Sequence, residues 1–250
     1  MKVTLIQMDI AWGDPECNVA TADRMIRENP GSDLYVLPEM WTTGFATQPE
    51  GIAESDSSES LEWMKATADR TGAAIAGSIA VRCLDGSYRN RFYFVRPGGL
   101  VDFYDKHHLF TYSGEHHRYT AGERKVIVEW KGIRFRMIVC YDLRFPGWAR
   151  NAEEYDALLC VASWPTPRVG AWRTLLKARA IENQCYVLGV NRVGTDPACQ
   201  YCGGTAFVDP YGEATECKDG EASALNAEID MDALAAFREK FPVLKDRDLI

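Results

Sequence analysis

Two kinds of hydrophobic pattern alternate along the first part of this chain. Short apolar stretches typical of buried strands occur at "KVTLIQMDI", "DLYVLPE" and "AAIAGSIAVRC". Between them, apolar positions recur at helical spacing over residues 18–28 and through "LEWMKATADR", which ends near Gly72. Asp56 stands three residues before Glu59, which predicts a capping box at the start of this second helix. The pattern therefore predicts strands that alternate with helices.

Turn signals and further periodic runs organise the rest of the chain. "LDGS" separates "AAIAGSIAVRC" from "YRNRFYFVRP", and Lys131-Gly132 joins "KVIVEW" to "IRFRMIVCYD", so both pairs are expected to form β-hairpins. A helix is predicted over residues 146–155 and another at "GAWRTLLKARAIENQ". Further strands are predicted at "ALLCVASW", "CYVLGVNRVG", "GTAFVDP" and "SALNAEID". Strands mixed with helices throughout favour an α/β layered fold with helices on the outer faces of a sheet that is not purely parallel.

Composition and charge narrow the class of protein. The 250 residues are 46% hydrophobic and 26% charged, so we expect residues 1–250 to form a single globular domain. The net charge is −8 and no stretch gathers lysine and arginine, which argues against a nucleic-acid partner. No apolar run approaches the roughly 20 residues that span a bilayer, and Met1 leads into "KVTLIQMDIAW" without a signal-peptide pattern. A cytoplasmic protein with no membrane partner is expected.

The cysteines and histidines do not predict a metal site. Eight cysteines are scattered through a large chain, which favours reduced, buried thiols over a disulfide framework. "CQYC" at 199–202 is a lone C-x-x-C without the second pair of ligands that a structural zinc site needs. The four histidines lie within residues 107–117, but adjacent side chains on a strand point to opposite faces. We therefore expect neither a metal nor an organic cofactor.

Three apolar runs end on a chemically reactive side chain. Glu39 ends "DLYVLPE", Lys106 stands in "LVDFYDKHHLF", and Cys140 follows "FRMIV". Ligands of open α/β sheets bind at such strand ends, although any one of these residues alone is more commonly solvated or part of the core. Pro146 predicts a helix start just after Cys140, where N–H groups would favour a thiolate.

The residue types suggest nucleophilic catalysis by the cysteine. A free thiol has a pKa near 8.5, so it needs a base or a cation to ionise, and Glu39 and Lys106 match those needs. All four histidines precede Cys140, which excludes the papain-like order of cysteine and histidine.

At these residues the sequence resembles the nitrilase superfamily of carbon–nitrogen hydrolases. "LPEMWTTGF", "DKHHLF" and "VCYDLRFP" resemble, in order, its general-base, lysine and nucleophile segments, and the likeness continues through "WRTLLKARAIENQCYVLGVNRVG" and "DPYGE". The resemblance implies an α-β-β-α sandwich, at least a dimer, and catalytic roles for Glu39, Lys106 and Cys140. It also implies that Glu115 in "SGEHHRYTAG" positions the lysine and substrate; the alternative is an exposed loop glutamate.

Within the superfamily, "SWPTPR" and the helix after it most resemble the ω-amidase branch, which hydrolyses the terminal amide of short dicarboxylic acid amides such as 2-oxoglutaramate. Ser163 departs from the asparagine expected there. In the implied mechanism, Glu39 takes the thiol proton of Cys140 and the thiolate attacks the amide. Lys106 and the backbone N–H of Tyr141 stabilise the oxyanion, and water then hydrolyses the thioester.

Such a substrate carries a carboxylate, for which Arg144 is the first candidate and Arg168 the second. Either arginine could instead pair with an internal carboxylate. Trp41, Phe45 and Trp164 are candidate pocket walls, although aromatic residues at strand ends are commonly core. Two further alternatives stay open: a hydrolase of N-carbamoyl amino acids, aliphatic amides or nitriles that uses the same residues, and a non-catalytic relative that binds a metabolite.

Overall fold

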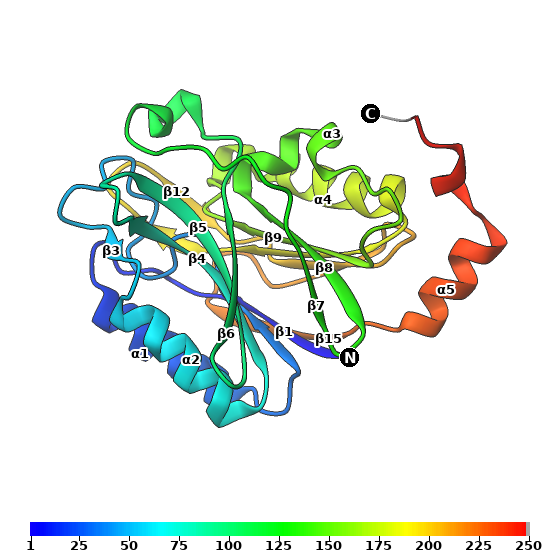
Figure 1. Cartoon of the computed structure of the whole chain (residues 1–250), viewed down its shortest axis with the longest axis horizontal. Coiled ribbons are helices and arrows are strands. Elements are labelled where there is room, and N and C mark those ends of the chain that lie inside the picture. The colour runs from blue at the N-terminus through cyan, green and yellow to red at the C-terminus, as the bar shows by residue number, and fades with distance from the viewer. Residues whose placement is uncertain (249–250) are drawn as a thin grey trace.

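The computed structural model describes residues 1–248 and shows two β-sheets packed between two layers of helices (Figure 1). One sheet has the order β15 (Ser223–Glu228), β1 (Lys2–Gln7), β2 (Leu34–Val36), β4 (Ala74–Arg82), β5 (Tyr88–Arg96), β6 (Leu100–Asp105), with β3 (Glu54–Ser55) beside β4. The other has the order β14 (Ala214–Glu216), β13 (Ala206–Val208), β10 (Tyr186–Asn191), β9 (Ala157–Ala162), β8 (Ile133–Val139), β7 (Ile127–Trp130). The α-β-β-α sandwich implied by the resemblance is confirmed.

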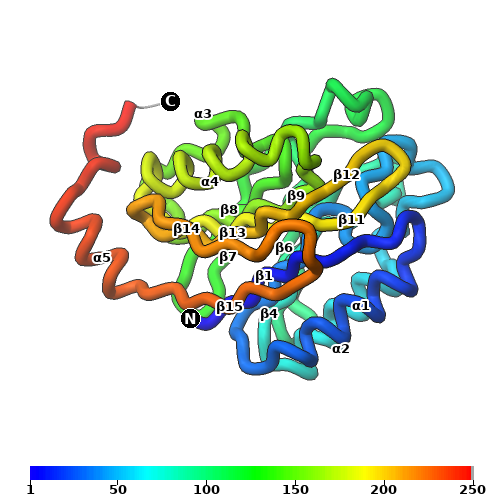
Figure 2. Tube along the Cα trace, turned by 180° about the vertical axis from the view of Figure 1, so that it is seen from behind, coloured from blue at the N-terminus to red at the C-terminus, as the bar shows by residue number. Residues whose placement is uncertain are grey.

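Helices cover the outer faces of both sheets. The α-helices are α1 (Pro15–Glu28), α2 (Glu59–Thr71), α3 (Pro146–Ala149), α4 (Val169–Asn183) and α5 (Met231–Lys240). Figure 1 shows α1 and α2 on one side of the sandwich and α3 and α4 on the other. Figure 2 shows α5 at one end of the molecule, and at the opposite end a small hairpin of β11 (Val193–Thr195) and β12 (Gln200–Cys202). Neither α5 nor this hairpin was predicted. Within residues 1–248, none of the helices has the length and hydrophobicity needed to span a lipid bilayer.

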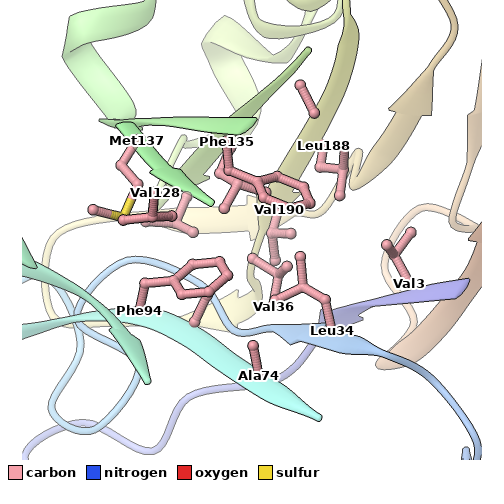
Figure 3. Close-up of a cluster of buried hydrophobic side chains, with 14 of the residues drawn as sticks. Val3, Leu34, Val36, Ala74, Phe94, Val128, Phe135, Met137, Leu188 and Val190 are labelled. Carbon is pink, nitrogen blue, oxygen red and sulfur yellow. The ribbon is translucent and has the colours of Figure 1, made fainter. Parts of the chain in front are cut away.

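Apolar side chains from both sheets form the central core (Figure 3). Alternation along β8 shows how the layers arise: Phe135, Met137 and Val139 point between the sheets, whereas Ile138 packs toward α4. Burying one such large side chain contributes about 1.5–3 kcal/mol, so the two-faced burial of this strand fixes its register. The end of β8, where Cys140 follows, is therefore held by packing on both faces.

The two predicted hairpins are present, but the predicted start of α2 is wrong. β4 and β5 pair antiparallel around "LDGS", and β7 and β8 pair around Lys131-Gly132. The N-cap of α2 is Ser58, whose Oγ accepts a hydrogen bond from the N–H of Leu61 at 3.2 Å. Asp56 instead pairs with Arg91 at 2.6 Å. The local pattern predicted that the Asp56 carboxylate would cap α2, but this carboxylate forms a long-range ion pair with Arg91.

The helix predicted over residues 146–155 is also wrong, because α3 ends at Ala149 after a single turn. Asn151 competes with the helix: its side-chain oxygen accepts from the N–H of Glu154 at 2.9 Å, and Glu153 adopts a left-handed conformation with φ of 65°. Residues 150–155 therefore form a turn that leads directly into β9.

Candidate active site

The residues predicted to be catalytic lie at the ends of strands from both sheets. Glu39 comes shortly after β2, Lys106 directly after β6, and Cys140 directly after β8. The Nζ of Lys106 lies 2.9 Å from Oε1 of Glu39 and 3.0 Å from Oε2 of Glu115, which the single-turn 3₁₀ helix η2 (Glu115–His117) carries. All three of these charged side chains are fully buried. The sandwich thus brings together residues that are far apart in the chain.

Cys140 sits in a strained turn rather than before a long helix. Its φ is 48°, a left-handed value that is uncommon for a residue with a side chain, and it opens the 3₁₀ helix η3 (Cys140–Arg144). Such strain at the end of a buried strand commonly marks a functional residue. The α-helix that follows, α3, has only four residues, so the predicted activation of the thiol by a helix N-terminus is wrong.

The electrostatics of the site keep the thiol protonated at rest. Burial raises the pKa of Cys140 well above its ordinary value, and the Glu39 carboxylate raises it further, while Lys106 opposes the change. The neutral thiol is therefore the resting form at neutral pH, and it needs a base to become a nucleophile. Glu39 is the neighbouring carboxylate that can take this proton.

The charge of Lys106 is maintained by the two glutamates. Burial alone would lower its pKa, but Glu115 and Glu39 more than offset this effect, so the pKa lies well above the ordinary value. For Glu115, burial raises the pKa, Lys106 lowers it and Glu39 raises it again, with a net rise. Glu115 also accepts from the backbone N–H of Phe110 at 2.6 Å. It is therefore a buried partner of the lysine, not an exposed loop residue.

Asn90 on β5 belongs to the same cluster and was missed in the sequence. Its Nδ2 donates to Oε1 of Glu39 at 2.8 Å and to Oε1 of Glu115 at 3.3 Å. A signal was present in "YRNRFYF": strand alternation places Asn90 on the same inner face as Phe92 and Phe94, where a polar side chain needs a buried partner. Asn90 thus bridges the two carboxylates.

The second oxygen of Glu39 is held by the segment that follows β9. Oε2 accepts from the backbone N–H of Ser163 at 2.8 Å, and the Ser163 hydroxyl donates to the Glu39 carbonyl oxygen at 3.3 Å. Because the backbone N–H holds the carboxylate, this contact does not require the asparagine that the ω-amidase resemblance leads one to expect at position 163.

A cavity of about 770 Å³ opens at Cys140. Its wall includes Phe45 and Trp164, as predicted for the pocket. Trp41 does not line it: this side chain is fully buried and packs against Trp63, with ring centroids 5.2 Å apart. The prediction for Trp41 is wrong because the chain turns after Glu39 and directs the next aromatic ring into the core beneath α2. Other residues on the wall are Tyr141, Arg144, Arg168, Trp12, Phe110, Tyr112 and Tyr201.

Two arginines present guanidinium groups to this cavity. The Cζ of Arg144 lies 4.8 Å from the ring centroid of Trp164, and that of Arg168 lies 5.4 Å from the ring of Phe110. Among residues 1–248, no carboxylate pairs with either guanidinium. The alternative of an internal partner is therefore not observed in the described part of the chain. Both guanidinium groups make cation–π contacts with these rings, and a planar guanidinium carries N–H donors that match a carboxylate.

None of the eight cysteines forms a disulfide. All eight are free thiols, including Cys199 and Cys202 of the C-x-x-C sequence. Within residues 1–248, no three side chains of histidine, cysteine, aspartate or glutamate are grouped as metal ligands. The ionisable side chains gathered at the site are the thiol of Cys140, the carboxylates of Glu39 and Glu115, and the buried ammonium group of Lys106.

Comparison with known proteins identifies the family of this chain. The family model described as carbon-nitrogen hydrolase matches residues 2–239. The chain is a carbon–nitrogen hydrolase. This hydrolase is 48% identical to the omega-amidase YafV of Escherichia coli (strain K12), over 99% of its own length and 97% of that relative. It is 36% identical to a 2-oxoglutaramate amidase of Bacillus subtilis (strain 168), over 98% and 96% of the two chains.

A solved structure supports the same assignment. A carbon–nitrogen hydrolase superfamily protein from Xanthomonas campestris superposes on this hydrolase with a TM-score of 0.96 and 39% identity, covering 100% of this chain and 98% of that one. The nitrilase superfamily predicted from the three motifs is confirmed, and the protein is an amide-hydrolysing enzyme.

Proposed function

We propose that this hydrolase cleaves the terminal amide of a short dicarboxylic acid amide, such as 2-oxoglutaramate, to the dicarboxylic acid and ammonia. The observation that carries the proposal is the guanidinium of Arg144, which lies in the cavity that contains Cys140 and forms no ion pair within the described residues 1–248. An ω-amide substrate has a carboxylate at its far end, and a planar guanidinium binds such a group with two parallel hydrogen bonds. The names of the E. coli and B. subtilis relatives agree with this substrate class.

In the first half of the proposed reaction, Glu39 takes the proton from the Cys140 thiol and the thiolate attacks the amide carbon. The Nζ of Lys106 and the backbone N–H of Tyr141 donate hydrogen bonds to the oxyanion that forms. The carbon–nitrogen bond then breaks, and Glu39 gives its proton to the departing ammonia. The raised pKa of Cys140 supports this order, because the thiol has to lose its proton as the reaction begins.

In the second half, Glu39 takes a proton from water and the resulting hydroxide attacks the thioester. The same two donors stabilise the second oxyanion, the carbon–sulfur bond breaks, and the Cys140 thiolate recovers the proton from Glu39. Glu115 and Asn90 act by holding the lysine and the base, since both lie in hydrogen-bonding contact with that pair. No metal or organic cofactor takes part in these steps.

Arg144→Ala is expected to lower kcat/KM for 2-oxoglutaramate by about 10–100-fold, because a hydrogen bond to a charged group contributes about 1.5–3 kcal/mol. Turnover of a neutral amide such as butyramide should change by less than about threefold. Steady-state ammonia release measures both. Arg24→Ala is the matched control, since this arginine is exposed, pairs with Glu28 and lies outside the cavity wall. Equal losses on the two substrates would contradict the role of Arg144, and Arg168→Ala then tests the second candidate.

The substrate class is tested by an ammonia-release panel that compares 2-oxoglutaramate, an N-carbamoyl amino acid, an aliphatic amide and a nitrile. We expect kcat/KM for 2-oxoglutaramate to exceed the others by at least about tenfold, since they lack a carboxylate in the matching position. A preference for any other member would replace the proposed substrate. A non-catalytic metabolite-binding protein is disfavoured, because a pure binder has no need for a base, a cation and a thiol together.

The remaining properties follow from the resemblance and the composition. We propose a cytoplasmic enzyme in which residues 1–250 form one domain and which assembles as a homodimer or larger homo-oligomer. Light scattering coupled to gel filtration measures this mass directly. With a net charge of −8 and no basic stripe, nucleic acid is not proposed as a partner.

A further inference from the structure

The carboxylate of Asp142 joins the chain segment that carries the lysine to the one that carries the nucleophile. Its side chain is fully buried, and Oδ1 accepts from the backbone N–H and from ring Nδ1 of His108, each at 2.8 Å. Oδ2 accepts from the N–H of Val139 at 3.0 Å and from the hydroxyl of Tyr104 at 2.7 Å. Since a carboxylate only accepts, the proton of the His108 ring lies on Nδ1. Four donors, two from His108 in the loop after β6 and one each from β6 and β8, thus converge on one side chain.

Aromatic stacking joins the same two segments a second time. The ring of His108 stacks on Phe145 with centroids 3.7 Å apart and an angle of 7°, and the ring of His107 stacks on Trp148 at 3.7 Å and 8°. The indole N–H of Trp148 donates to the Tyr104 hydroxyl at 2.9 Å. The histidine pair in "DKHHLF" therefore packs on the aromatic residues of "FPGW", and the orientation of the His108 ring is set from both sides.

This junction lies beside the two groups that hold the oxyanion in the proposed mechanism. His108 is two residues after Lys106, and Asp142 is the residue directly after Tyr141. Neither His108 nor Asp142 is part of the cavity wall, so neither contacts the substrate. One oxyanion donor comes from each segment, and the relative position of the segments therefore determines the distance between the donors.

We propose that Asp142 and His108 are a positioning pair that sets the separation of the Lys106 ammonium group and the Tyr141 N–H. The inference rests on the proposed mechanism and adds two residues to it. A displacement of about 1 Å between groups that act together in a transition state can cost about 10²-fold in rate. Loss of the pair should therefore lower kcat, while binding of the ground-state amide, which depends on the cavity wall, persists.

The test compares His108→Ala with His108→Asn. The alanine variant should lose about 10²-fold in kcat with KM changed by less than about threefold, because the oxyanion exists only in the transition state and the intermediate. Asparagine places an N–H donor near the position of Nδ1 and should recover at least about tenfold of that loss. His116→Ala is the matched control, since His116 is exposed and outside the cavity. The substrate is whichever amide the unmodified enzyme hydrolyses best in the panel above.

Alkylation of Cys140 separates positioning from general damage to the site. Iodoacetamide needs the thiolate but forms no oxyanion, so His108→Ala should change its rate by less than about threefold. Unchanged kcat in His108→Ala, no recovery in His108→Asn, or an equal fall in alkylation and turnover would each overturn the proposal. A panel in which 2-oxoglutaramate is a poor substrate contradicts the proposed function alone, since the comparison of His108 variants uses the preferred amide.

Discussion

Replacement of Cys140 by serine is expected to lower turnover of every amide substrate by at least about 10³-fold while changing the free energy of unfolding by less than about 1 kcal/mol. The hydroxyl is far harder to ionise than a thiol. The side chain keeps nearly the same shape, so the turn at φ of 48° should persist. Ammonia release and urea unfolding measure the two quantities.

Control variants and mass spectrometry test whether the loss of turnover is specific to Cys140. Cys17→Ser and Cys202→Ser are matched controls, since these free cysteines lie outside the cavity wall and should leave turnover unchanged. Mass spectrometry of the acid-quenched enzyme should find the acyl group on Cys140 in the unmodified protein and nowhere in Cys140→Ser. An adduct on Cys160 or Cys202, or retained turnover in the serine variant, would falsify the assignment of the nucleophile.

Lys106→Met is expected to reduce both stability and turnover, because it removes the only cation from a buried group of two carboxylates within the described residues. Breaking a buried ion pair in this way costs about 3–5 kcal/mol of unfolding free energy. Loss of an oxyanion donor alone lowers kcat by about 10²–10³-fold. Urea unfolding and steady-state kinetics on the preferred amide measure the two effects. Lys218→Met, at an exposed pair with Glu221, should cost at most about 1 kcal/mol and leave kcat unchanged.

A second substitution distinguishes the loss of stability from the loss of turnover in Lys106→Met. Glu115→Gln in the Lys106→Met background removes one of the uncompensated charges, so it should recover at least about 1 kcal/mol of stability. It should not restore turnover, because the oxyanion still lacks the ammonium group. Recovery of activity together with stability would mean that Lys106 serves the fold and not the chemistry.

The sequence predicted a catalytic set from local motifs, and the structure brings its members close together. Glu39, Lys106 and Cys140 each end a recognisable apolar run, and their order matched a known superfamily. The local signals were less reliable for helix starts. Asp56 had the spacing of a capping residue but pairs with Arg91, a residue 35 positions away. The cap was mispredicted because a distant cation competed for the same carboxylate.

The residues that support the catalytic set were harder to find, since nothing nearby in the chain identifies their partners. Asp142 stands within the nucleophile motif, yet its hydrogen bonds to His108 cross 34 residues. Asn90 reaches Glu39 across 51 residues. Strand alternation could have shown that Asn90 faces inward, but not that it bridges two carboxylates.

Hydrophobic periodicity and motif order by themselves predicted the layered α/β fold and the superfamily, and both are confirmed; the roles of Glu39, Lys106 and Cys140 stay predictions. These are properties of neighbouring residues, and they persist in any chain with this pattern. Only the tertiary structure decided that the pKa of Cys140 is raised rather than lowered and that Trp41 is core. It also decided that the Arg144 guanidinium in the cavity forms no ion pair with another of residues 1–248. Burial and charge pairing depend on distances between groups such as Ser163 and Glu39, which are 124 residues apart and meet only when the two sheets pack.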